Sequence, residues 1–292
     1  MKLLITGAHG QVGSDLVTLA IAAGYIVSAA SRSELDISQQ SIVTSFLEDI
    51  KPDLVINAAA YTAVDKAEEE QDLAYAINRD GAKYLAIACA RQNIPLFHIS
   101  TDYVFDGTQA EPYKETDTPS PLGVYGNSKW QGEEAIREQL HDYIILRVAW
   151  VFGAHGNNFV KTMLRLGNER DSLSIVADQS GGPTPAKNIA ETLITLARQY
   201  QESKTLKWGT YHYCGSPQTT WFDFADNIFR QAKDLNLLNK NIKLTPITTE
   251  QYPTAAKRPA NSMLDCSAIK ATFNINMPDW RMALKTMLTN LQ

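Results

Sequence analysis

A glycine-rich turn near the N-terminus constrains the fold more than any other part of the sequence. Residues 2–6 read as a short apolar strand, and an apolar helical pattern begins near Leu16. Between them, Gly7, Gly10 and Gly13 stand in the sequence GAHGQVG. Glycines let the backbone approach a pyrophosphate, whose charge is met by the N-terminus of the next helix. An ordinary βα turn is the alternative, but strand, turn and helix together favour a dinucleotide-binding βαβ unit.

The βα alternation continues along the first half of the chain. We expect further strands at residues 25–30, 54–60, 95–100 and 143–149, separated by helical segments. This pattern predicts an α/β fold, a Rossmann-type doubly wound parallel sheet. The alternation becomes irregular after about residue 150, which predicts a smaller C-terminal substrate lobe. We therefore expect an NAD(P)-binding domain at residues 1–150, with later segments returning to it, and a mainly substrate-binding lobe at 151–292.

The end of the second strand bears on the choice of cofactor. An NAD site usually carries an acid here to bind the ribose 2′-hydroxyl. This chain instead has Ser31 and Arg32, which are suited to a 2′-phosphate because guanidinium pairs well with phosphate. A solvated loop arginine is the alternative. We expect NADPH as cofactor, with NADH also usable.

Two polar stretches in the middle of the chain predict the chemistry. Thr101 and Asp102 follow an apolar strand, and the carboxyl ends of such strands hold the ligands of open α/β sheets. Tyr125 and Lys129 are four residues apart and share one helical face. The lysine ammonium favours the phenolate, so the pair suits general acid catalysis. An exposed pair on a solvated helix is the alternative.

Composition narrows the classes of protein. The formal net charge is −5 with mixed signs, which gives no basic surface for nucleic acid or membrane. The sequence has no long apolar run, and we expect no signal peptide; Cys89, Cys214 and Cys266 show neither metal nor disulfide spacing. We expect three buried thiols and a cytoplasmic protein.

Several local features carry further expectations. We expect a helix after the second strand capped by Asp36 or Ser38, and one helix from the acidic residues 65–72 through residue 90. Asn78 is either a buried polar anchor or a surface residue. Residues 239–258 read as polar substrate-side loops, and Arg147 is unusual inside an apolar run.

Together these segments resemble the extended short-chain dehydrogenase/reductase family. The glycine loop, the sequence NAAA at 57–60, STD at 100–102 and YGNSK at 125–129 carry the resemblance. Within that family the chain is most similar to the dTDP-4-dehydrorhamnose reductases. The segments that carry this closer similarity are TGAHGQVG (6–13), NAAAYTAVD (57–65), STDYVFDG (100–107), PLGVYG (121–126), RVAWVFG (147–153), NNFV (157–160) and RPANS (258–262).

The resemblance implies reduction of the 4-keto group of a dTDP-sugar by a nicotinamide cofactor. It implies catalytic roles for Thr101, Tyr125 and Lys129, and sugar contacts from Thr101, Asp102, Tyr103, Tyr125 and Trp150. Core packing is the alternative for Trp150. The cofactor-binding residues that it and the motifs imply are Gly7, His9, Gly10, Gln11, Val12, Gly13, Ser31, Arg32, Asp36, Ile37, Ala58, Ala59, Ala60, Tyr61, Thr62, Tyr125 and Lys129.

Two other functions stay open at this point. One is a different nucleotide-sugar 4-ketoreductase or epimerase, which would use the same Tyr/Lys pair. The other is a non-catalytic cofactor-binding regulatory subunit like that of methionine adenosyltransferase. Some relatives form dimers held partly by a divalent cation on acidic side chains, and Asp15 and Glu191 fall at comparable places. Two distant acids are a poor metal signal, so we expect surface acids, no metal, and a homodimer as the candidate assembly.

Overall fold

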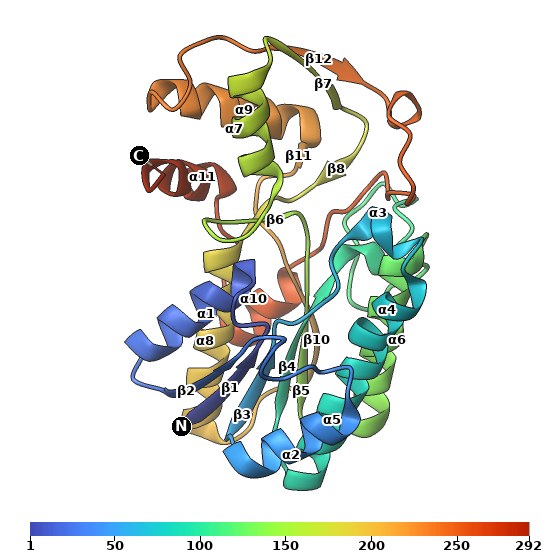
Figure 1. Cartoon of the computed structure of the whole chain (residues 1–292), viewed down its shortest axis with the longest axis vertical. Helices are drawn as coiled ribbons and strands as arrows, with labels where there is room; N and C mark the ends of the chain where they lie inside the picture. Colours follow the sequence, from blue (N-terminus) through green and yellow to red (C-terminus); the bar gives the residue numbers. More distant parts are fainter. Residues whose placement is uncertain (292) are drawn as a thin grey trace.

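A six-stranded parallel sheet forms the centre of the molecule in the computed structural model, which describes residues 1–291 (Figure 1). The strand order is β10-β5-β4-β3-β1-β2, so the chain reverses its direction of travel between β1 and β3. The bounds of these strands are β1 Lys2–Thr6, β2 Ile26–Ala30, β3 Leu54–Asn57, β4 Leu96–Thr101, β5 Tyr143–Val148 and β10 Gly209–Tyr213. The doubly wound sheet predicted from the sequence is confirmed, and a ligand site is expected beside the reversal.

Helices cover both faces of this sheet. Because successive strand residues point to opposite faces, Leu3 and Ile5 pack on one side while Leu4 packs on the other. The first side is covered by α1 (Gln11–Ala22), α8 (Ala186–Ser203) and α10 (Ser267–Phe273). The second is covered by α2 (Gln40–Ile50), α5 (Gly81–Gln92) and α6 (Val124–Gln139). Since α8, β10 and α10 come from the second half of the chain, that half does return to the sheet.

A smaller lobe has its own apolar core at the carboxyl ends of the strands (Figure 1). It contains α7 (Phe159–Glu169), α9 (Trp221–Asp234), α11 (Trp280–Thr289), and the parallel pair β7 (Ser172–Val176) and β12 (Lys243–Ile247). Short strands join it to the sheet: β6 (Val151–Phe152) pairs with β9 (Thr184–Pro185), and β8 (Ser180–Gly181) pairs with β11 (Thr219–Thr220). Within residues 1–291, no helix combines the length and apolar character needed to cross a lipid bilayer.

Three local predictions were wrong. Residues 239–258 are not all loop, because β12 and the 3₁₀ turn η3 (Thr249–Gln251) lie within them. Pro246 obscured this strand, although an edge strand tolerates proline. Neither Asp36 nor Ser38 caps a helix: α2 begins at Gln40, and the Asp36 carboxylate accepts from the Ser38 amide and hydroxyl in a local turn.

The third wrong prediction concerns the acidic stretch. The prediction fails only at the start, where α3 (Val64–Ala67) is a separate short helix; α4 (Gln71–Tyr75), the π-helical turn η1 (Ala76–Asp80) and α5 form one continuous helical run, as expected. Asn78 lies in the π-turn, buried, where its amide bonds both the N–H and the carbonyl of Tyr61 and also the Ser128 hydroxyl. A π-turn at a functional position is a recurrent feature, and here it settles Asn78 as a buried polar anchor.

Candidate active site

Thr101, Tyr125 and Lys129 come together at the carboxyl end of β4. Thr101 is the last residue of that strand, and Tyr125 and Lys129 lie in the first turns of α6. All three line one cavity of about 650 Å³. Tyr125 is partly buried and Lys129 is only 2% exposed, so this is not the solvated surface pair considered as the alternative.

Two glycines allow α6 to lie against its neighbours. A Cβ on Gly126 would stand 2.1 Å from the carbonyl oxygen of Tyr103, and one on Gly132 would stand 2.1 Å from that of Asn78. Any larger residue would push the helix outward. The position of Tyr125 therefore depends on these two glycines of its own helix.

The tyrosine is a neutral acid at ordinary pH. Burial raises the pKa of Tyr125 to about 12, with the Thr101 hydroxyl acting in the opposite direction and the Asp102 charge in the same direction. The Tyr103 ring meets the Tyr125 ring edge to face, with centroids 5.4 Å apart. A phenol held in this form donates a proton rather than accepting one.

Lys129 is held by β4. Its Nζ donates to the carbonyl of Ile99 at 2.6 Å and lies 3.1 Å from Nε2 of His98. Burial lowers the pKa of Lys129 to about 8, and the Glu133 carboxylate opposes that effect. The lysine therefore titrates in the physiological range, where its charge can respond to the reaction.

A buried ion pair explains the arginine inside the apolar strand β5. Arg147 contacts the Glu133 carboxylate through Nη2 at 2.7 Å and through Nε at 2.9 Å. Ser100 donates to the same carboxylate at 2.5 Å. Burial alone would raise the pKa of Glu133, but Arg147 and Arg137 bring it below its ordinary value. This pair ties α6 to β4 and β5 directly behind the site.

The glycine loop has the shape of a dinucleotide cradle. Gly7 has φ +65°, and a Cβ there would lie 2.6 Å from the backbone nitrogen of Ala59. A Cβ on Gly13 would lie 2.1 Å from the carbonyl oxygen of Gly7. Gly10 precedes α1, and Gly10, Gln11 and Val12 line the same cavity as Tyr125. The loop thus presents backbone N–H groups at a helix N-terminus, a geometry that fits a pyrophosphate.

The other predicted cofactor residues divide into two groups. Ala58, Ala60 and Thr62 line the cavity, and Ala59 and Tyr61 lie beside them in the same segment. Tyr61 is fixed by Asn78 and donates to Glu70 at 2.7 Å. His9, Ser31, Arg32, Asp36 and Ile37 do not line this cavity; His9 and Arg32 are exposed, whereas Ile37 is buried against Gly81.

A carboxylate lies at the end of β2 after all. The sequence has no acid at Ser31, but Glu34 folds back and accepts from the Ser31 amide at 2.8 Å and from its hydroxyl at 2.7 Å. These bonds hold the pKa of the Glu34 carboxyl below its ordinary value. Sequence reasoning missed Glu34 because it is three residues beyond the expected place.

Aromatic and acidic groups line the part of the cavity where the sequence predicts sugar contacts. Asp102 is 3% exposed, and its Oδ2 has no hydrogen-bond partner among residues 1–291. Burial raises the pKa of Asp102 to about 6, against the effect of the Ser262 and Thr101 hydroxyls. Trp150 has the unusual φ of 46° and stacks on Trp221 at 3.6 Å. A Cβ on Gly181 would stand 2.3 Å from the Trp150 ring, so Gly181 makes room for that ring.

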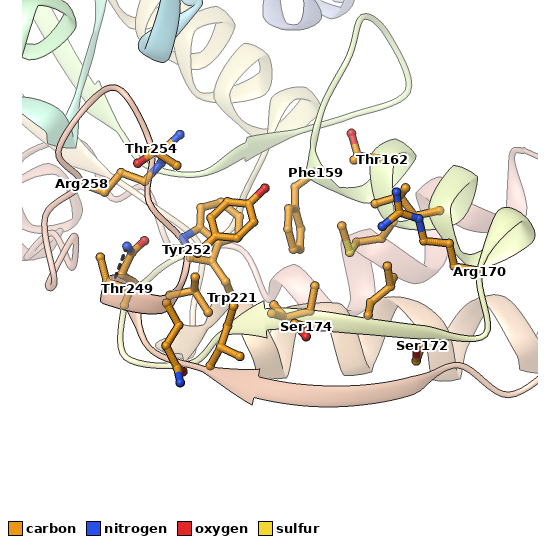
Figure 2. Close-up of a pocket in the computed structure, with 18 of the residues that line it drawn as sticks. Phe159, Thr162, Arg170, Ser172, Ser174, Trp221, Thr249, Tyr252, Thr254 and Arg258 are labelled. Atoms are coloured by element: carbon orange, nitrogen blue, oxygen red, sulfur yellow. Dashed lines mark hydrogen bonds between the residues drawn. The ribbon is translucent and has the colours of Figure 1, made fainter.

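A second cavity of about 770 Å³ lies next to the first and is lined mainly by residues of the smaller lobe. Tyr103, Phe159 and Trp221 line both cavities. Figure 2 shows Phe159, Trp221 and Tyr252 close together, with Arg258 and Thr254 on one side and Arg170 on the other. Arg258 also pairs with Asp65 at 2.7 Å, which links this lobe to the acidic segment after β3. Sequence reasoning treated Trp221 as core and missed this role.

Asp15 and Glu191 line a separate cavity of about 630 Å³, which is bordered by α1, α8 and α11. His155 lies 3.8 Å from Asp15, and Lys187 borders the same cavity. Burial raises the pKa of Asp15, whereas the nearby charges of His155 and Lys187 lower it. Among residues 1–291, no three or more His, Cys, Asp or Glu side chains gather as they would around a metal ion.

Comparison with known proteins agrees with this geometry. A model of the RmlD substrate binding domain matches residues 1–292. A dTDP-4-dehydrorhamnose reductase of Aggregatibacter actinomycetemcomitans is 49% identical over 98% of each chain. A crystal structure of dTDP-4-dehydrorhamnose reductase from Bacillus anthracis, in complex with NADP, superposes with a TM-score of 0.92 at 37% identity, covering 99% of each chain.

A more distant structure shows how widely the fold is shared. The UDP-glucose 4-epimerase of Thermus thermophilus in complex with NAD has a TM-score of 0.77 at 19% identity, covering 99% of this chain and 98% of the epimerase. The full-length matches favour the reductase prediction over both alternatives. The chain belongs to the RmlD substrate-binding family, and its full-length relatives include dTDP-4-dehydrorhamnose reductases.

Proposed function

We propose that this protein uses NADPH to reduce the 4-keto group of dTDP-4-dehydro-L-rhamnose, giving dTDP-L-rhamnose. The observation that carries the proposal is the single cavity in which Thr101, Tyr125 and Lys129 meet the glycine loop before α1. A second cavity of about 770 Å³ shares three lining residues with the first and would take the nucleotide part of the substrate. Family membership supplies the substrate class and the cofactor.

The cofactor, when bound, supplies a hydride to the carbonyl carbon. Tyr125 then donates its phenolic proton to the developing alkoxide, and Thr101 holds the same oxygen through its hydroxyl. The Lys129 ammonium stabilises the phenolate that remains. Each of these groups is fixed by β4 or α6 before the substrate arrives, which lowers the entropy cost of reaching the reactive geometry.

We assign the sugar to the region around Asp102, Tyr103 and Trp150. The unpaired Oδ2 of Asp102 is buried and would accept a hydrogen bond from a sugar hydroxyl. The nucleoside diphosphate would extend into the second cavity, where Arg258 supplies positive charge and Tyr252, Phe159 and Trp221 supply ring faces (Figure 2). On this assignment, residues 1–150, together with the later segments that return to the sheet, bind the cofactor. Residues 151–292 mainly bind the substrate.

The adenosine end of the cofactor would lie along the β2 loop, with Ser31 and Arg32 at the 2′-phosphate and Asp36 and Ile37 near the adenine. We further propose a cytoplasmic homodimer. In support of a reducing compartment, all three cysteines are buried free thiols, even though the sulfurs of Cys214 and Cys266 are only 3.7 Å apart.

A direct assay tests the function. Purified protein is mixed with NADPH and dTDP-4-dehydro-L-rhamnose, and nicotinamide absorbance and the product's C4 proton are followed. We expect stoichiometric NADPH oxidation and the rhamno configuration at C4. If NADPH is consumed and the product has the opposite configuration at C4, the protein is a different 4-ketoreductase. Tight NADPH binding without any oxidation of it would support the regulatory-subunit alternative.

A further inference from the structure

Four buried side chains form a continuous chain from β1 to α6. Thr6 Oγ1 donates to Asn57 Oδ1 at 2.6 Å, Asn57 Nδ2 lies 2.9 Å from His98 Nδ1, and His98 Nε2 lies 3.1 Å from Lys129 Nζ. The exposed fraction of each of the four residues is 2% or less. None of Thr6, Asn57 and His98 has a part in the mechanism described above, yet their chain ends on the lysine.

The direction of these hydrogen bonds is fixed by one backbone group. The N–H of Ala59 can only donate, and it contacts Asn57 Oδ1 at 3.1 Å. The oxygen of that amide therefore faces Ala59 and Thr6, and the NH₂ group faces His98. His98 Nδ1 must accept this hydrogen bond, so a neutral His98 carries its single proton on Nε2.

The imidazole is neutral in this environment. Burial and the adjacent Lys129 hold the pKa of His98 well below its ordinary value. Its Nε2–H therefore points at Lys129 Nζ. An ammonium has three donors and no lone pair, so it cannot accept this bond, whereas a neutral amine can. The amine can still donate to the Ile99 carbonyl.

Other groups near Lys129 act in both directions. On α6 the Glu133 carboxylate favours the ammonium, and on the same helical face Tyr125 shares the cavity. From β4 and the turn after it, Thr101 and Asp102 also reach the cavity. Burial and the His98 N–H both favour the amine. The protonation of Lys129 is thus balanced between opposing neighbours, and a change at His98 shifts the balance.

We propose that His98 is a positioning residue that donates from Nε2 to the Lys129 amine and thereby sets the alkaline limit of the reduction. The proposal rests on the function proposed above. In the reaction, the Tyr125 O–H bond breaks as the product O–H bond forms. The phenolate regains a proton from the Lys129 ammonium, and the resulting amine is stabilised by His98 until solvent protonates it again. At pH values where Lys129 is already a neutral amine, it has no proton to return to Tyr125, and kcat falls.

The His98 tautomer can be measured without any assay of activity. In the protein labelled with ¹⁵N-histidine, we expect NMR to show His98 protonated at Nε2 and not at Nδ1 at neutral pH. The His98→Gln spectrum identifies the resonance. An Nδ1–H tautomer or an imidazolium at neutral pH overturns the proposal, whether or not the reductase assay succeeds.

The pH profile of kcat gives the functional readout. The glutamine of His98→Gln can turn its carbonyl oxygen toward Lys129 and accept from the ammonium. We expect the alkaline limb of kcat to move up by about one pH unit, or roughly tenfold in the lysine proton equilibrium. An unmoved limb overturns the proposal even if kcat falls at every pH.

His212 provides a matched control. It is also a fully buried strand histidine, but its ring contacts Arg147 and the Tyr113 carbonyl instead of Lys129. We expect His212→Gln to leave the alkaline limb in place, whatever its effect on stability. An equal shift in both variants would mean that the effect is general loosening of the sheet, and the role assigned to His98 would be wrong.

Discussion

The carboxylate of Glu34 accepts two hydrogen bonds from Ser31, at 2.8 Å from its amide and 2.7 Å from its hydroxyl. Ser31 was expected to donate to a 2′-phosphate, and in the structure its donors already have an acidic partner. The exposed Arg32 would attract the 2′-phosphate of NADPH, whereas the Glu34 carboxylate would repel it. We therefore expect Arg32 and Glu34 to act in opposite directions on the preference between the two nicotinamide cofactors.

For the cofactor we expect NADPH to be preferred over NADH by a modest factor. Arg32→Ala should weaken NADPH binding about tenfold and leave NADH binding nearly unchanged. The contact that is lost with the 2′-phosphate is charge-assisted, but solvent screens it. Glu34→Gln should have the opposite effect and strengthen NADPH binding, because it removes a negative charge that repels the 2′-phosphate. Steady-state kinetics with both cofactors on all three proteins decides this. Equal or better efficiency of the parent protein with NADH would contradict it.

The general acid has the clearest kinetic consequence. Tyr125→Phe should keep NADPH binding and lose about 10²–10⁴-fold in kcat, since the phenolic proton is gone while the ring still packs against Tyr103. Cofactor binding is measured by fluorescence titration and turnover by nicotinamide absorbance. Tyr103→Phe is the matched control and should lose far less kcat. Near-normal turnover of Tyr125→Phe would exclude Tyr125 as the acid.

Asp102 should give the acid limb of the pH profile. Because burial raises the pKa of Asp102 to about 6, its carboxylate protonates as the pH falls through that value. A neutral carboxyl accepts a weaker hydrogen bond from the sugar, so kcat/KM of the parent should fall below about pH 6. In Asp102→Asn this limb should disappear, with kcat/KM at neutral pH reduced about 10–150-fold.

The Asp102 prediction has two separable readouts. The maximal kcat of Asp102→Asn should change less than kcat/KM, because Tyr125 still delivers its proton. An acid limb that persists unchanged in Asp102→Asn would assign the titration to another group.

The buried pair of Glu133 and Arg147 should dominate local stability. Glu133→Gln leaves the Arg147 charge buried without a counter-charge, and we expect a loss of about 3–5 kcal/mol in the free energy of unfolding. The exposed pair of Glu169 and Arg165 is the control, where Glu169→Gln should cost about 0–1 kcal/mol. Urea denaturation at neutral pH measures both. Similar losses in the two variants would show that the buried pair has no special weight.

The sign of the pH dependence follows from Glu133. Its pKa in the folded protein is below its ordinary value, so its contribution is fully present above the unfolded pKa of about 4.3. The contribution is lost as the pH falls through the folded-state pKa. The difference in unfolding free energy between parent and Glu133→Gln should therefore shrink under acid conditions and stay constant near neutrality.

Local sequence was enough to place the elements whose signals are short-range. The strand at Lys2–Thr6, the glycine turn, and the start of α6 at Val124 follow from apolar runs, glycines and helical spacing, all of which act over a few residues. Ligands of open α/β sheets bind at the carboxyl ends of the parallel strands, which all lie at one edge of the sheet. This is why Thr101, at the end of β4, could be predicted to lie in one site with Tyr125 and Lys129.

The sequence alone determined the fold class, the glycine loop before α1 and the three side chains that meet in the cavity, whereas tertiary structure decided how their charges are set. The ion pair of Glu133 with Arg147 and the hydrogen-bonded path from Thr6 to Lys129 join residues on different elements, and no periodicity in the sequence records such contacts. The pKa values depend on burial as well, which exists only after α6 has packed on the sheet. Identity and spacing of residues specify what chemistry is available, and packing specifies at which pH it operates.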